Sequence, residues 1–212
     1  MIARRAILTG TAALTLGAAP VPRFPDLRFE VLRNGGPIGQ HTIRIRQDGT
    51  ALEASIDVDI VVRVGPIVLY RYALKARESW RDGAFASMES ETNDDGTRQW
   101  VKATQAADHV AVEASGKAAV RLPANALPLT HWNILCMERP LFDPQDGTAV
   151  QSSVQPRGEE TVPLADGRTV RATRYALIGK VALDNWYDTA RHWTALRAPA
   201  RDGSTIEYRR VA

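Results

Sequence analysis

Apolar and polar residues alternate along most of this chain. The clearest run covers residues 55–64, where every second position is apolar and most positions between carry a charge. The apolar positions are Ile56, Val58, Ile60, Val62 and Val64, and the charged positions are Asp57, Asp59 and Arg63. A period of two is typical of a β-strand that buries one face. A helical period is nearly absent, so the pattern predicts a mainly β protein.

Pairs of an Asn or Asp with a following Gly divide these runs at regular intervals. They are Asn34-Gly35, Asp48-Gly49, Asp82-Gly83, Asp95-Gly96, Asp146-Gly147, Asp166-Gly167 and Asp202-Gly203. Such pairs tolerate the positive φ angles of tight hairpin turns. Short turns favour antiparallel neighbours, so we expect about ten to twelve strands in an antiparallel meander.

The stretch LTHWNILC, residues 129–136, departs from this alternation. Pro128 precedes it, Pro140 follows it, and Thr130 is suited to cap the start of a helix. Apolar residues recur in it at a spacing of three and four, namely Leu129, Trp132, Leu135 and Cys136. These features predict one short helix near residues 129–138.

The chain's single cysteine, Cys136, lies close in sequence to His131, and a thiol beside an imidazole is a candidate nucleophile with its base. On a helix that turns about 100° per residue, Cys136 lies about 40° from Trp132 but about 140° from His131. The thiol and the imidazole therefore point apart. We expect Cys136 to be a small buried apolar residue, and one cysteine cannot form an internal disulfide.

The first 19 residues have the composition of a signal peptide. Arg4 and Arg5 precede a run of apolar or small residues, 6–19, and no acid occurs among them. The arginine pair resembles a twin-arginine export signal, and the run is too short to span a membrane. We therefore expect an exported, periplasmic protein that does not span the membrane, with Pro20 leaving the position of cleavage open.

Removal of residues 1–19 leaves 25 basic and 24 acidic residues. The basic residues are scattered among the acids rather than clustered, so nucleic-acid binding is not expected. A chain of this length buries about 70% of its unfolded surface in one core. Residues 20–212 are therefore predicted to form a single antiparallel β domain.

Four segments carry a resemblance to a known family. They are FEVLRNGGPIGQHTIRI at residues 29–45, YRYALKARESWRDGAFASMESETNDDGT at residues 70–97, LTHWN at residues 129–133 and NWYDTARHWTALRAPARDGSTIEYRR at residues 185–210. Together they resemble a family of exported bacterial proteins known only as a domain of unknown function. The resemblance implies a layout similar to the periplasmic lipoprotein carriers, an antiparallel half-open barrel curled around one short helix. It implies no catalytic residues.

In a half-open barrel, His41, Glu78 and Arg174 would interrupt otherwise apolar strand faces that look into the cavity. A buried charge is costly unless it is paired, so Glu78 and Arg174 should contact each other, a ligand or water. Two interpretations stay open. One is a structural ion pair beside a buried histidine, and the other is a polar group at the base of an apolar ligand pocket.

The remaining candidate cavity residues are aromatic or lie at the expected rim. They are Tyr70, Tyr72, Trp80 and Trp132 inside, His131 and Asn133 at the rim, and Tyr187 at the mouth. NWYD followed by TARHW also fits a strand, a turn and a returning strand, which explains Asp188 without a ligand. The histidines lack zinc-motif spacing and no phosphate-binding glycine loop occurs, so no metal or cofactor is predicted.

The sequence specifies neither the ligand, nor a reaction, nor the oligomeric state, and two classes of function remain. The first is a binding or carrier module that holds an apolar or amphipathic small molecule between sheet and helix. The second is a cofactor-free acid/base enzyme of the lyase, isomerase or cyclase type, with Glu78 or His41 as base and Arg174 orienting an anion. A closed pocket that contains His41, Glu78 and Arg174 together would favour the enzyme. An open apolar groove would favour the carrier.

Overall fold

The computed structural model of the protein describes residues 23–212, so the predicted signal peptide and its cleavage site lie outside the described residues. The regular structure consists of fifteen strands and one short 3-10 helix, η1 (Ile134–Met137). The strands are β1 (Leu27–Arg33), β2 (Gly36–Asp48), β3 (Ala51–Val64), β4 (Ile67–Arg81), β5 (Ala84–Asp94), β6 (Thr97–Gln105), β7 (His109–Ala114), β8 (Val120–Pro123), β9 (Leu127–Pro128), β10 (Leu141–Phe142), β11 (Ser152–Pro163), β12 (Thr169–Gly179), β13 (Leu183–Asp188), β14 (Trp193–Pro199) and β15 (Thr205–Arg210).

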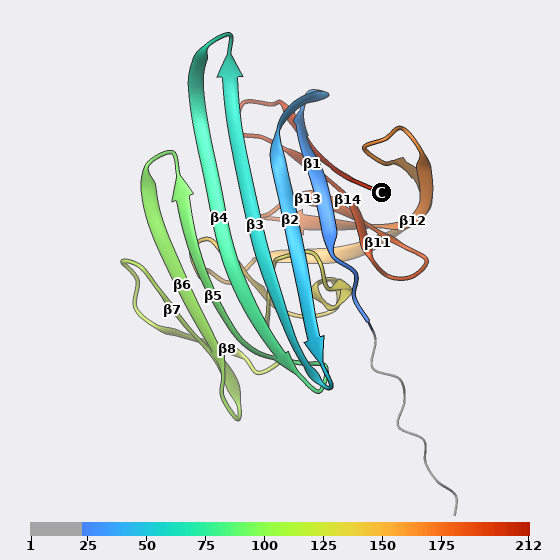
Figure 1. Ribbon diagram of the computed structural model, residues 1–212. Helices are drawn as coiled ribbons and strands as arrows, with labels where there is room; N and C mark the ends of the chain where they lie inside the picture. The colour runs from blue at the N-terminus through green and yellow to red at the C-terminus, as the bar shows by residue number, and fades with distance from the viewer. Residues whose placement is uncertain (1–22) are drawn as a thin grey trace, which may run out of the picture.

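Thirteen of these strands form one antiparallel sheet, in the order β11-β12-β13-β14-β15-β1-β2-β3-β4-β5-β6-β7-β8. Every pairing is between sequence neighbours except that of β1 with β15, which joins the two ends of the described chain. The sheet curls strongly but stays open, because β8 and β11 are its two edges (Figure 1). The predicted antiparallel meander is confirmed, with more strands than the ten to twelve expected.

The Asn-Gly and Asp-Gly pairs that separate the alternating runs of the sequence also lie at the connections between strands. Six of the seven Asn-Gly and Asp-Gly pairs connect consecutive strands, and the seventh, Asp146-Gly147, lies in a loop. Three pairs form two-residue hairpin connections in which both residues have positive φ: Asn34-Gly35, Asp82-Gly83 and Asp95-Gly96. Such turns match the twist of the strands that they join.

The segment between β8 and β11, residues 124–150, crosses the concave face of the sheet, and we call it the strap. Figure 1 shows it inside the curve of the strands. Its buried apolar side chains join those of the strands in the main core. From the strap these are Ala126, Leu127, Leu129, Trp132, Ile134, Cys136, Met137, Leu141 and Phe142. The strap therefore fills the space that the sequence assigned to a helix.

The predicted helix over residues 129–138 is wrong. Only the four residues of η1 are helical, and they form a 3-10 turn that Asn133 caps, its side chain accepting a hydrogen bond from the Leu135 amide at 3.1 Å. His131 has a φ of 67°, which is incompatible with a right-handed helix, so Thr130 cannot begin one. Residues 23–212 contain no helix long and apolar enough to cross a bilayer.

Gly39 in β2 shows how closely the strands pack. A Cβ atom at this position would lie 2.0 Å from the backbone oxygen of Asp59 in β3. Gly39→Ala is therefore expected to lower the free energy of unfolding by about 2 kcal/mol or more. Gly36→Ala in the same strand is the control, because its Cβ would meet only the Arg33 oxygen at 3.5 Å. Urea unfolding that gave equal stabilities for the two variants would contradict this packing.

Candidate functional site

A cavity of about 310 Å³ lies at the end of the concave face where β3 begins and β4 ends. Its wall is mostly apolar, with polar side chains toward the solvent. The apolar wall consists of Phe24, Leu52, Trp80, Trp132, Ile134 and Leu135, and the other lining residues are Arg23, Gln47, Thr50, Gly83, Asn133, Ala190, Arg191 and His192. The volume falls at the lower end of the range for small-molecule sites, about 300–1,000 Å³.

Three aromatic rings from separate segments build the inner wall. Trp80 lies at the end of β4, Trp132 comes from the strap, and Phe24 precedes β1. The Trp132 ring meets Trp80 edge-on at 5.6 Å between centroids and meets Phe24 edge-on at 5.0 Å. Edge-to-face contacts of this kind hold aromatic rings in fixed orientations. The wall is therefore formed before any ligand binds.

Glu78 lies directly behind the two indoles and is fully buried. Its Oε2 accepts hydrogen bonds from the indole N–H of Trp80 at 2.8 Å and from that of Trp132 at 3.1 Å. Oε1 makes no hydrogen bond of normal geometry, although the Thr130 hydroxyl is close enough to favour the charged form. Burial outweighs these contacts and raises the pKa of Glu78 to about 7. Glu78 thus fixes the two rings that line the cavity.

A second buried group holds the other side of the strap. The His131 ring stacks on Trp193 at 5.0 Å, and its Nδ1 lies 3.2 Å from Nδ2 of Asn185. The His131 backbone oxygen accepts a hydrogen bond from the Tyr187 hydroxyl at 2.8 Å. These contacts account for the left-handed backbone of His131, because the strap turns here to place the imidazole against β13 and β14.

His41 lies in the same aromatic group, edge-on to Trp193 at 5.2 Å. Burial lowers the pKa of His41 to about 3, with a smaller effect from His131, and lowers the pKa of His131 to about 4. Both rings are therefore neutral at pH 7. The Nε2 atom of His41 is buried with no hydrogen-bond partner among the described residues.

The thiol of Cys136 is a packing group, as expected. It is buried and donates a weak hydrogen bond to the Pro128 backbone oxygen at 3.3 Å. Burial raises the pKa of the thiol to about 12, so it stays protonated at neutral pH.

Arg174 lies on the opposite face of the sheet from Glu78. It is half-exposed, bonds Asp184 at 2.8 Å, and packs over the Trp186 ring at 5.6 Å. Trp186 belongs to a small separate core on that outward face, with Val162, Ala172 and Ala195. Glu78 and Arg174 therefore do not meet, and the ion pair considered between them does not form.

The structure brings together only part of the predicted site. Trp80, Trp132 and Asn133 line the cavity, whereas Glu78, His41 and Tyr187 are buried beneath the strap. His131 belongs to the strap itself and is only partly exposed. Tyr70 donates to Asp94 at 2.6 Å near the far end of β4, and Tyr72 packs against the core. Sequence reasoning missed Phe24, Leu52 and Ile134, since no local pattern marks residues that meet only through the fold. Arg191 and His192 were candidates for the mouth that the sequence also explained as a turn, and the structure places both in the cavity lining.

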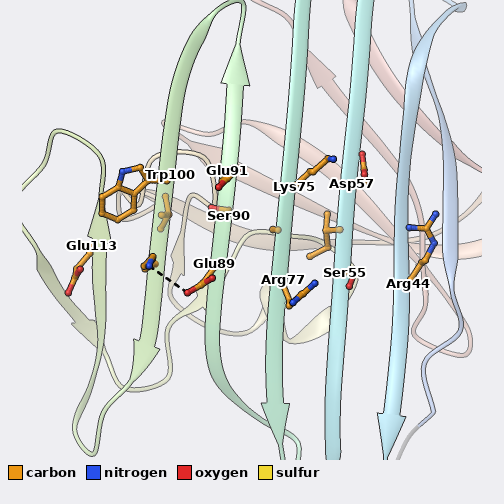
Figure 2. A pocket seen from close by; sticks show the side chains of 14 residues that line it. Arg44, Ser55, Asp57, Lys75, Arg77, Glu89, Ser90, Glu91, Trp100 and Glu113 are labelled. Atoms are coloured by element: carbon orange, nitrogen blue, oxygen red, sulfur yellow. Dashed lines mark ion pairs between the residues drawn. The ribbon is translucent and has the colours of Figure 1, made fainter.

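A larger open groove, of about 660 Å³, covers the outward face of the sheet from β2 to β7. Figure 2 shows its side chains standing in rows across the strands. One such row runs across successive strand pairings through Arg44, Ser55, Arg77, Glu89, Lys102 and Glu113. Opposite charges alternate in it from Arg77 to Glu113, and Lys102 lies 3.8 Å from Glu89. This groove is a solvated face held by cross-strand charge pairs.

Residues 23–212 contain no cluster of three or more His, Cys, Asp or Glu side chains arranged to hold a metal ion.

Comparison with known proteins supports the fold and leaves the activity open. A crystal structure of a β-barrel-like protein, a domain of unknown function DUF1849 from Brucella abortus, superposes with a TM-score of 0.61. The match covers 88% of this chain and 94% of that one at 8% sequence identity, so it shows a shared fold alone. No curated protein matches. The family model of the domain of unknown function DUF6134 matches residues 29–211, and the chain belongs to this family.

Proposed function

We propose that this protein is a binding or carrier module for an apolar or amphipathic small molecule, which occupies the cavity between the strap and the ends of β3 and β4. The observation that carries the proposal is the aromatic and aliphatic wall of that cavity, about 310 Å³ in volume. Apolar cavities with a few polar groups at the mouth are the usual form of small-molecule sites. The predicted export signal would place such a module in the periplasm.

The polar residues of the cavity suggest how an amphipathic ligand would lie. The apolar part would contact Trp80, Trp132 and Leu135, while Arg23 and Arg191 stand at the solvent side. Arg191 is exposed and already pairs with Glu138 at 2.9 Å. A negatively charged head group would compete with Glu138 for this guanidinium. The best candidates are therefore short-chain carboxylates or similar anions with one apolar tail.

The geometry does not favour the alternative of an acid/base enzyme. A general base must come within hydrogen-bond reach of the proton that it removes. Glu78 faces the cavity only through the two indoles bonded to it, and His41 lies behind the strap. Among the described residues that line the cavity, none is His41, Glu78 or Arg174. The arrangement is that of a rigid wall rather than of an exposed catalytic base.

Titration with a short-chain fatty acid, followed by intrinsic tryptophan fluorescence, tests the proposal. We expect saturable binding that Leu135→Asp weakens at least about tenfold, because a carboxylate in the wall must be desolvated against the apolar tail. Ile178→Asp is the matched control: Ile178 is an exposed apolar residue of β12 outside the cavity. Absence of saturable binding by the unaltered chain, or equal binding by the two variants, would refute the proposal.

A further inference from the structure

The hairpin of β3 and β4 extends beyond its neighbours at the end of the sheet opposite the cavity. Pairing of β2 with β3 ends at Gly39 and Ile60, and pairing of β4 with β5 ends at Tyr72 and Asp94. Beyond these points the strand ladder of residues 61–71 lies within the hairpin, and only Arg71, at its base, also forms hydrogen bonds to Asp95. Figure 1 shows this end of β3 and β4 projecting past the adjacent hairpins. We call residues 61–71 the apex.

The apex exposes large apolar side chains to solvent. Val64, Ile67 and Leu69 are 62%, 61% and 56% exposed, the three highest values among the exposed large apolar residues of the described chain. Gly65 and Pro66 between them are exposed as well. Contiguous exposed apolar surface on a native protein marks a contact with another apolar phase or partner.

The charged residues within the apex are all basic. No acid occurs from residue 60 to residue 77, whereas exposed Arg63 and Arg71 flank the apolar tip. Neither guanidinium forms an ion pair with a residue of the described chain. Asp94 and Asp95 lie at the base of the apex, where they accept hydrogen bonds from the Tyr70 hydroxyl and the Arg71 amide. The tip itself is therefore apolar and positively charged.

We propose that the apex docks onto an anionic lipid surface, with Val64, Ile67 and Leu69 entering the boundary between head groups and acyl chains. Apolar residues with flanking basic residues are the composition of membrane-surface anchors. A stable protein partner needs a surface of about 800 Å² on each side, which a two-stranded tip does not offer. A fluid bilayer accommodates a narrow projection.

This inference does not depend on the ligand cavity. Leu52 and Trp80, which line the cavity, pair with each other at the far end of the same two strands. Leu135→Asp should therefore leave lipid binding unchanged. The two proposals can fail separately.

Cosedimentation with vesicles tests the proposal, using a chain that begins at Pro20, so that the apolar run 6–19 contributes nothing. This chain retains every described strand and the whole described core. One set of vesicles contains equal parts of phosphatidylglycerol and phosphatidylcholine, and the other contains phosphatidylcholine alone. We expect binding to the anionic vesicles only, reduced at least about tenfold by Ile67→Asp with Leu69→Asp, and roughly tenfold by Arg63→Gln with Arg71→Gln.

Val120→Asp is the matched control, because Val120 is an exposed apolar residue on the edge strand β8. It should bind the anionic vesicles as the unaltered chain does. Thermal unfolding would show that all variants fold, since the altered side chains are exposed. The proposal is overturned by failure of the unaltered chain to bind anionic vesicles, by equal binding to both vesicle types, or by an apex variant that binds normally. Binding lost equally in Val120→Asp would also overturn it.

Discussion

Glu78→Ala is expected to lower the free energy of unfolding by roughly 4 kcal/mol at pH 5. The substitution leaves the indole N–H groups of Trp80 and Trp132 buried without an acceptor and opens a small hole in the core. An unsatisfied buried donor costs about 1–3 kcal/mol, and the lost volume adds to this cost. Urea unfolding at pH 5 measures the effect.

Glu78→Gln keeps the hydrogen bonds to the two indoles but removes the ionisable group, so it separates their effects on stability. The amide oxygen of Gln can accept from both indoles, so we expect stability within about 1 kcal/mol of the unaltered chain at pH 5. The folded chain raises the pKa of Glu78 from 4.5 to about 7. Between these values the folded state binds more protons than the unfolded state, so stability falls as pH rises, by about 3 kcal/mol in total.

The glutamine variant cannot undergo this loss and should be about 3 kcal/mol more stable than the unaltered chain at pH 8. Urea unfolding of both proteins at pH 5 and pH 8 measures the crossover. A difference between them that stays constant across this range would show that Glu78 does not titrate as described.

The second large effect is the loss of stability in acid that arises from His41 and His131. The folded chain lowers their pKa values from 6.5 to about 3 and about 4. Below pH 6.5 the unfolded chain binds protons that the folded chain excludes, so stability falls as pH falls. By pH 4 each ring contributes a loss of about 3 kcal/mol. As the pH falls from 7 to 4.5, protonation of Glu78 in the folded chain raises the free energy of unfolding and offsets part of this loss.

His41→Leu isolates one of these contributions. Leucine removes the unpartnered Nε2 and keeps an apolar side chain within the ring cluster, so we expect stability within about 1 kcal/mol of the unaltered chain at pH 7. The loss between pH 7 and pH 4 should be smaller by about 3 kcal/mol. Urea unfolding at the two pH values measures it, and an unchanged loss would mean that His41 is protonated in the folded chain.

The alternation of residues predicted the strands well because one face of each strand contacts a continuous core. Within residues 55–64, Ile56, Val58 and Val62 are buried as the pattern requires, but Val64 is exposed in the apex. The pattern could not show this difference, because it records which residues share a face and not where the sheet ends. The Asn-Gly and Asp-Gly pairs predicted the hairpin turns well because tolerance of a positive φ angle is a local property of these residues.

Arg174 illustrates a second limit of the pattern. β12 carries apolar residues on both faces: Ala172 belongs to the outward core, whereas Leu177 belongs to the main core. The alternation correctly predicts that Arg174 and Ala172 share one face of the sheet, but it cannot show whether that face is the concave or the outward one. The curvature of the whole sheet decides this, and curvature depends on all thirteen strands.

The helix predicted from the stretch LTHWNILC was wrong for another reason. Spacing of three and four over eight residues is equally compatible with a loop whose apolar side chains point into one core. Tertiary contacts decided the outcome: Trp132 bonds Glu78, and His131 stacks on Trp193. An eight-residue helix has little intrinsic stability to oppose such contacts.

The cavity itself could be anticipated only in part. Trp80, Trp132 and Asn133 were predicted to lie in or around a cavity, whereas Leu52 joins them through its pairing with Trp80, and Phe24, which precedes β1, joins them through its contact with Trp132. No period or motif connects residues that far apart in sequence.

Quenching of tryptophan fluorescence by a brominated fatty acid tests the proposed ligand cavity most directly. Trp80 and Trp132 line the cavity, whereas Trp100 and Trp186 lie on the outward face and Trp193 lies behind the strap. We predict saturable quenching at one ligand per chain, relative to the unbrominated acid, and its loss in Leu135→Asp but not in Ile178→Asp. Quenching that is absent, or that persists unchanged in Leu135→Asp, would contradict a ligand site in this cavity.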